Sequence, residues 1–141
     1  MPFLLNIVSY SADKLIKPVN YAILGMNMTS APEIKKDAMY QLLRDGKIKE
    51  FNYHRGKGKK PDLVNCDFRA IDLQGLNAEG LDFSGCYFRN SDLRGIDFSK
   101  SKMDGASIHD AKVSGAYFPS DFTSDELTMS IIRGTRLRAG L

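Results

Sequence analysis

Residues 67–99 read DFRAIDLQGLNAEGLDFSGCYFRNSDLRGIDFS, and their large apolar side chains recur at intervals of five or ten residues. These positions are Phe68, Leu73, Phe83, Phe88, Leu93 and Phe98. An α-helix repeats about every 3.6 residues and a β-strand about every 2, so neither has this period. The stretch therefore indicates a chain that is neither a helix nor an uninterrupted strand.

The same period extends over residues 61–118. Its central positions are Leu63, Phe68, Leu73, Ala78, Phe83, Phe88, Leu93, Phe98, Met103, Ile108, Val113 and Phe118. Two residues before each centre stands a small or apolar residue, which shares a face with the centre if the backbone is extended. Because five is odd, the chain must turn once per repeat to keep each such pair inside. The sequence thus predicts a coil of short sides whose core is formed by these centres, apart from the small Ala78.

The run CDFRA IDLQG LNAEG LDFSG CYFRN SDLRG IDFSK, residues 66–100, resembles the pentapeptide-repeat family. The resemblance covers residues 61–118. It implies a mainly β fold, a right-handed quadrilateral parallel β-helix of about three coils with four five-residue sides per coil. Residues 20 apart would then stack at about 4.8 Å, the spacing of neighbouring strands.

An uncapped coil would expose apolar side chains and unpaired backbone, so each end needs a cap. Residues 1–60 are the expected N-terminal cap, with a helix over about 31–45 that begins at a capping box of Ser30 and Glu33. The following KIKEFNYHR, residues 47–55, alternates weakly and is expected to cover the first coil as a strand.

Residues 1–29 are expected to pack against this cap, with Pro18 preventing one long helix.

Two interpretations compete for the C-terminal cap, residues 119–141. A fourth coil would have centres at Phe122, Leu127, Ile132 and Leu137. It requires one deleted residue after Phe118 and turns Asp125 inward, which burial of a charge disfavours. The alternative is a helix over about 124–133, with Thr123 as its cap and Gly134 as its stop. The helical interpretation is favoured.

Length and composition indicate a globular chain with one domain. The chain has 141 residues, of which 43% are hydrophobic and 26% charged. No apolar run approaches the roughly 18 residues of a membrane span. The N-terminal apolar run has no basic residue before it, so a secretory signal is not expected. A cytoplasmic location is expected.

Basic residues are concentrated in the N-terminal part. Residues 1–60 carry 11 Lys and Arg against 5 Asp and Glu, whereas residues 61–141 carry 9 against 12. Much of the excess lies in HRGKGKK, residues 54–60, which is typical of a flexible, solvated connection. No aromatic interleaving or groove-reading motif accompanies it, so nucleic-acid binding is not expected.

The cysteines and histidines indicate neither a metal site nor an active site. Cys66 and Cys86 are 20 apart and should stack as free, buried thiols. Two inward cysteines lack the further ligands that zinc needs. His54 and His109 belong to no motif that unites a nucleophile, a base and an orienting group. We therefore expect neither catalysis nor a cofactor.

One outward row resembles a binding site once the repeats are stacked. Arg69, Arg89 and His109 each follow a centre on the same side, Tyr87 shares that side, and Arg94 lies on the next. Stacked donors of this kind can bind a phosphate or an acidic partner. The plainer alternative is a solvated ladder in which each arginine pairs with a neighbouring aspartate.

These features predict a non-catalytic protein-interaction or scaffold module, whose partner is another protein. The resemblance also raises an alternative, because some relatives are DNA mimics that protect type II topoisomerases with a long, acidic, dimeric rod. The short coil and the weak acidity of residues 61–141 disfavour mimicry. A sealed C-terminal end favours a monomer, while a dimer stays open.

Overall fold

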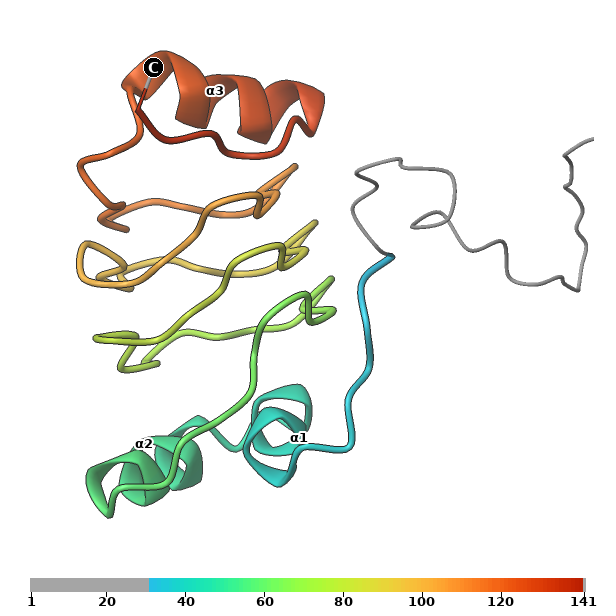
Figure 1. Ribbon diagram of the computed structural model, residues 1–141, viewed down its shortest axis with the longest axis vertical. Coiled ribbons are helices and arrows are strands. Elements are labelled where there is room, and N and C mark those ends of the chain that lie inside the picture. The colour runs from blue at the N-terminus through green and yellow to red at the C-terminus, as the bar shows by residue number, and fades with distance from the viewer. Residues whose placement is uncertain (1–30, 141) are drawn as a thin grey trace, which may run out of the picture. The chain divides into compact units, whose positions relative to one another are not determined.

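The computed structural model describes residues 31–140, which belong to one compact unit. The packing expected of residues 1–29 lies outside the described residues. The described part contains the helices α1 (Ala38–Arg44), α2 (Ile48–Gly56) and α3 (Ser124–Arg133). In Figure 1, α1 and α2 lie at one end of a stack of chain turns, and α3 lies at the other end. None of the helices in residues 31–140 is long and apolar enough to cross a membrane.

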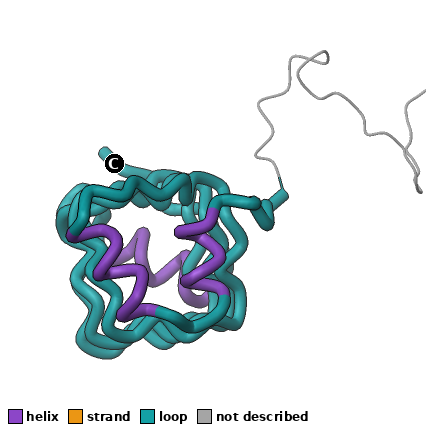
Figure 2. The backbone as a smooth tube through the Cα atoms, turned by 90° about the horizontal axis from the view of Figure 1, so that it is seen from below, coloured by secondary structure: helices purple, strands orange, loops and turns teal. Residues whose placement is uncertain are grey.

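The chain between α2 and α3 folds as a β-helix. Isolated parallel bridges join residues 20 apart, including Asp67 with Tyr87 and Tyr87 with Ser107. Each bridge involves one residue of each turn, because a five-residue repeat leaves no room for a longer strand. Viewed along the stack, the turns follow one another around a four-cornered outline (Figure 2).

The corners require a left-handed backbone. Gly85 has φ +72°, and an added Cβ would lie 1.9 Å from Oδ1 of Asn65 on the preceding turn. Glycine adopts this conformation without strain, and an added Cβ would force the Asn65 side chain to move. Where the repeat lacks glycine, the corner conformation persists: Asn90 has φ 60° and Ala70 has φ 58°. The turn geometry is thus a property of the repeat and not of glycine alone.

Stacked aromatic rings fill the coil. The ring centroids of Phe68 and Phe88 are 5.2 Å apart with 7° between the planes, and those of Phe98 and Phe118 are 5.7 Å apart. Phe83 contacts Phe88 from the adjacent side at 5.5 Å. Of the expected core residues, nine are buried: Leu63, Phe68, Leu73, Phe83, Phe88, Leu93, Phe98, Met103 and Ile108. Val113 and Phe118 are half-buried and pack against this core.

The predicted helix over 31–45 is wrong at its start. Asp37 is the N-cap, and its carboxylate accepts the amide N–H of Tyr40 at 2.9 Å. The preceding Glu33 is extended and bridges Cys66 in parallel. Its N–H donates to the Asn65 carbonyl at 2.8 Å, so Glu33 occupies a ladder position and not the first turn of a helix. Pairing of Glu33 with Asn65 and Cys66, which are distant in sequence, is thus favoured over the local capping signal for a helix.

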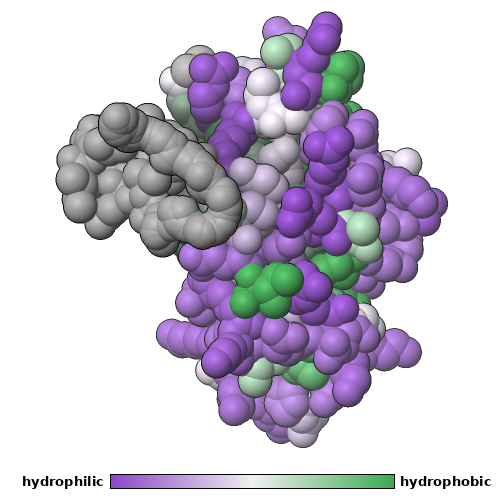
Figure 3. All heavy atoms as spheres, turned by 90° about the vertical axis from the view of Figure 1, so that its right-hand side faces the viewer, coloured by the Kyte–Doolittle hydropathy of each residue, from purple (hydrophilic) through white to green (hydrophobic). Residues whose placement is uncertain are grey.

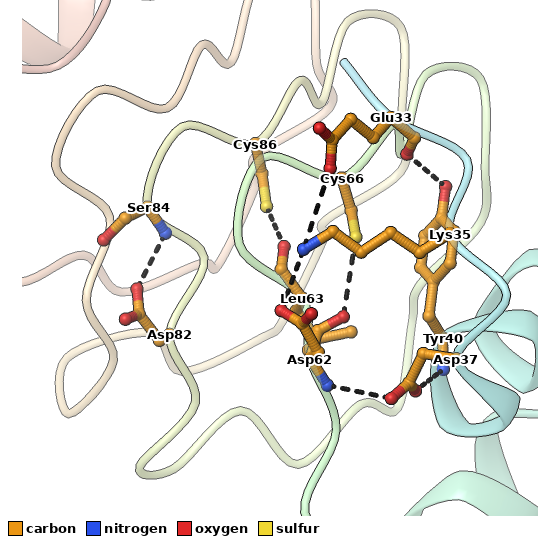
Figure 4. A network of polar contacts seen from close by, with 10 residues as sticks. All are labelled: Glu33, Lys35, Asp37, Tyr40, Asp62, Leu63, Cys66, Asp82, Ser84 and Cys86. Carbon is orange, nitrogen blue, oxygen red and sulfur yellow. Dashed lines mark hydrogen bonds and ion pairs between the residues drawn. The ribbon is translucent and has the colours of Figure 1, made fainter. Parts of the chain in front are cut away.

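Polar contacts hold this extended segment on the first turn of the coil (Figure 4). The Lys35 ammonium lies 2.8 Å from a carboxylate oxygen of Asp62 and 3.9 Å from one of Glu33. The Tyr40 hydroxyl donates to the Asp67 carbonyl at 2.6 Å. Segment 33–40 is therefore fixed to the repeats by side chains as well as by its backbone.

The covering strand predicted over 47–55 is also wrong, because these residues form α2. Ile48 and Phe51 are one helical turn apart, and Phe51 is fully buried. The helix pairs with the coil through side chains: Asn52 donates to the Gly75 carbonyl at 2.9 Å, and Arg55 donates to the Glu79 carbonyl at 2.7 Å. HRGKGKK is not simply a linker, since its first three residues end this helix.

A helix lies where the helical interpretation of the C-terminal cap placed it. The Thr123 hydroxyl accepts the Glu126 N–H at 3.1 Å, and Gly134 ends α3 with φ +75°. Helix α3 closes the stack through the buried Ser130 hydroxyl, which accepts the Ile108 N–H at 3.0 Å. The chain then returns to the coil, where the Leu137 N–H donates to the Ala106 carbonyl at 2.8 Å.

We predict that Phe88→Ala lowers the free energy of unfolding by about 3–5 kcal/mol, because the lost ring leaves a cavity between neighbouring turns. The measurement is urea-induced unfolding followed by circular dichroism. The control Tyr117→Ala removes an aromatic ring that is 67% exposed, and its effect should be about 0.5 kcal/mol or less. Equal effects of the two substitutions would contradict a stack held by Phe88.

Candidate functional site

The structure brings Arg69, Arg89 and His109 onto adjacent turns of the coil. The Ala70 N–H donates to the Arg89 carbonyl at 2.8 Å, and the Asn90 N–H donates to the His109 carbonyl at 3.0 Å. The apolar residue before each of them, on the same turn, is fully buried. Their side chains are consequently held outward in one row by the stacking of the core.

Arg69 is neutralised by its own repeat. Its Nε and Nη2 donate to the two carboxylate oxygens of Asp67 at 2.9 and 2.8 Å. The hydrogen bonds from the Arg69 side chain hold the pKa of the Asp67 carboxyl below its usual range. Arg69 is therefore paired with a neighbouring aspartate, as the plainer alternative in the sequence predicted, although Asp67 itself is buried.

Arg94 is not brought into the row. It pairs with Asp92 at 2.6 Å, in the repeat that follows Arg89. The arrangement is the same as that of Arg69 with Asp67, since the arginine follows the aspartate by two residues in each case. Arg94 thus belongs to a local ion pair on the next side.

Arg136 joins the row from the C-terminal segment. Its guanidinium lies over the Tyr87 ring, with Cζ 4.5 Å from the ring centroid. It also donates to the Tyr87 hydroxyl and, at 2.5 Å, to the Gly105 carbonyl. Arg136 could not be predicted from the sequence, because its position depends on the path of the chain after α3.

His109 lies beneath the end of α3. A Cβ added at Gly134 would be 3.1 Å from Nδ1 of His109, so glycine there admits the imidazole as well as the left-handed turn. Nε2 of His109 lies 3.5 Å from a carboxylate oxygen of Asp110, which is more than half exposed. His109 is therefore confined on one side and accessible on the other.

A small pocket of about 110 Å³ lies between these side chains. Its lining residues are Tyr87, Arg89, Ser107, His109, Gly134 and Arg136. Within residues 31–140, no Asp or Glu lies within ion-pair distance of Arg89 or Arg136. Two guanidinium groups without a carboxylate partner make this pocket suited to an anion.

The cysteines are free and buried, as the sequence predicted. The Cys86 Sγ lies 2.8 Å from the Leu63 carbonyl oxygen, and the two thiols point into the first turns (Figure 4). Burial raises the pKa of the Cys66 thiol to about 12 and also raises that of Cys86. Both are therefore protonated and unreactive near neutral pH. In the described part of the chain, no group of three or more His, Cys, Asp or Glu could hold a metal.

We predict that the Asp67–Arg69 pair makes stability depend on pH. A carboxyl whose pKa is lowered by folding stabilises the fold above its unfolded value of about 3.9, and that contribution is lost as the pH falls through the folded pKa. Asp67→Asn should therefore be less stable than the wild type at pH 7, and the difference should shrink toward about pH 2.

The measurement is urea unfolding of both proteins across this pH range. Asp104→Asn, which changes an exposed aspartate, serves as the matched control and should differ from the wild type by about 0.5 kcal/mol or less at pH 7. A constant difference between wild type and Asp67→Asn at every pH would contradict the role of the pair.

Comparison with known families identifies the repeats. A family model for pentapeptide repeats matches residues 60–90 and 82–118, in 8 copies. Neither the curated proteins nor the solved structures gave a match to this chain. The matched residues include the parallel bridges and the buried centres described above. Residues 60–118 of the chain therefore consist of pentapeptide repeats.

Proposed function

We propose that this protein is a non-catalytic interaction module that binds an acidic group of a protein partner in the pocket of Arg89, His109 and Arg136. The single observation behind the proposal is that Arg89 and Arg136 both line the pocket and neither has a carboxylate partner among residues 31–140. The module is built on a right-handed quadrilateral coil of about three turns, and it acts as a monomer.

The size of the pocket supports an acidic side chain or terminus as the ligand. A volume of about 110 Å³ accommodates one carboxylate, whereas sites for small molecules typically have volumes of about 300–1,000 Å³. The Tyr87 ring, with Arg136 stacked on it, adds a flat surface beside the charges. A partner segment that ends in a carboxylate, or presents Asp or Glu, fits this combination.

Rigidity supports recognition by this row. The backbone on both sides of Arg89 is hydrogen-bonded to neighbouring turns, through Phe88 and Asn90. Such fixed side-chain positions reduce the ordering cost of association. Figure 3 shows one face of the molecule, which is mainly hydrophilic and has its hydrophobic residues in small separate patches.

DNA mimicry receives no support from this site. A duplex mimic needs rows of carboxylates, whereas the row here presents Arg89, His109 and Arg136. The net charge of residues 61–141 is only weakly negative. We therefore retain the interaction module as the proposed function.

We predict that Arg89→Glu reduces partner capture by at least about tenfold, because it reverses a charge in the lining of the pocket. The measurement is affinity capture from the lysate of the source cell, quantified by mass spectrometry. The control Lys100→Glu reverses an exposed charge two repeats further along the coil and should capture as the wild type does. Circular dichroism establishes that both variants are folded. A set of captured proteins unchanged by Arg89→Glu would contradict the proposal.

A further inference from the structure

A second pocket lies against the C-terminal end of α2, and none of its residues lines the Arg89 pocket. Its volume is about 380 Å³. Its lining residues are Arg55, Gly58, Lys59, Lys60, Pro61, Gly80, Leu81 and Asp82. The pocket therefore joins the basic segment 54–60 to the corner at Gly80 and to Asp82 in the next repeat.

Arg55 is held in place with one donor unused. Its Nη2 donates to the Glu79 carbonyl at 2.7 Å, which fixes the guanidinium against the coil. Its Nη1 is buried and has no hydrogen-bond partner in the structure. This N–H is enclosed by the protein, so Arg55 acts on a ligand in the pocket through the positive charge of its guanidinium.

The neighbouring carbonyl groups do not supply the missing acceptor. At the end of α2, the His54 carbonyl accepts the Lys59 N–H at 3.1 Å and the Arg55 carbonyl accepts the Gly58 N–H at 3.0 Å. The carboxylate of Asp82 accepts the Ser84 N–H at 2.9 Å. These backbone contacts order the loop around the pocket while leaving the Arg55 Nη1 unpaired.

The charge of the lining is positive. Arg55, Lys59 and Lys60 contribute three cations against the single carboxylate of Asp82. Within residues 31–140, none of the three cations has a carboxylate at ion-pair distance. A monovalent carboxylate would leave much of this charge uncompensated, whereas a phosphate carries a charge of about −1.5 to −2 and has three or more acceptor oxygens.

We propose that this pocket binds a phosphate dianion, either free or as a monoester. The guanidinium charge of Arg55 and the ammonium groups of Lys59 and Lys60 attract and neutralise the phosphate oxygens. Its volume of about 380 Å³ exceeds that of the Arg89 pocket and leaves room for the organic group of a monoester.

The test is isothermal titration of the full chain with inorganic phosphate at constant ionic strength. The variant Lys59→Gln, Lys60→Gln removes two exposed charges from the pocket and leaves the structural bond from Arg55 to Glu79 intact. The matched control, Lys47→Gln, Lys49→Gln, removes the same charge from the other end of α2, outside the pocket.

We expect saturable binding by the wild type, a dissociation constant raised at least about tenfold in the Lys59, Lys60 variant, and a change of less than about twofold in the control. Absence of saturation by the wild type, or equal weakening in both variants, would overturn the proposal. Circular dichroism excludes unfolding as the cause of a loss.

Two further titrations assign the source of the phosphate and separate this site from the proposed function. N-acetyl-phosphoserine amide binding more tightly than inorganic phosphate would support a monoester as the ligand, and equal or weaker binding would support free phosphate. Arg89→Glu should leave phosphate binding unchanged, since Arg89 does not line this pocket. Loss of phosphate binding in Arg89→Glu would place the anion in the other pocket and overturn the inference.

Discussion

The structure depends on keeping the apolar residue of every five-residue repeat inside the coil. That constraint requires a turn at each repeat and places residues 20 apart in contact, as Phe68 and Phe88 show with ring centroids 5.2 Å apart. The same register aligns the backbone, so that Asp67 bridges Tyr87 and Tyr87 bridges Ser107. The five-residue spacing therefore determines both the packing of the core and the rows of side chains on the surface. An outward row such as Arg69, Arg89 and His109 is fixed in position by the buried residues that precede it in each repeat.

Prediction from sequence succeeded for the repeats because their signal is local and periodic. The position of Phe68, Phe88 and Ile108 in one column follows from spacing alone, and with it the row of Arg69, Arg89 and His109. The N-terminal cap was predicted poorly because its residues respond to distant partners. Glu33 pairs with the backbone at Asn65 and Cys66 in preference to capping a helix. Residues 48–56 have too few apolar positions to distinguish a helix from a strand.

In the candidate site, too, the residues of the repeats could be predicted from sequence and the residue of the cap could not. Arg89 and His109 were predictable because they belong to the repeat, whereas Arg136 reaches the row only because the chain reverses after Gly134 and pairs with Ala106. The pocket at Arg55 likewise combines a cap helix with the corner at Gly80. Both basic pockets thus form where a cap meets the coil. The repeats hold Arg89 and His109 in fixed positions, and the caps add Arg136 to one pocket and Arg55 to the other.

The measurement that decides most about this arrangement is a nuclear Overhauser experiment between the Tyr87 ring protons and the side-chain protons of Arg136. Strong cross-peaks are expected, because the Arg136 guanidinium carbon lies 4.5 Å from the Tyr87 ring centroid. Cross-peaks between the rings of Phe68 and Phe88 report on the coil in the same spectrum. Their presence without any contact from Arg136 to Tyr87 would show an intact coil that lacks the proposed binding pocket.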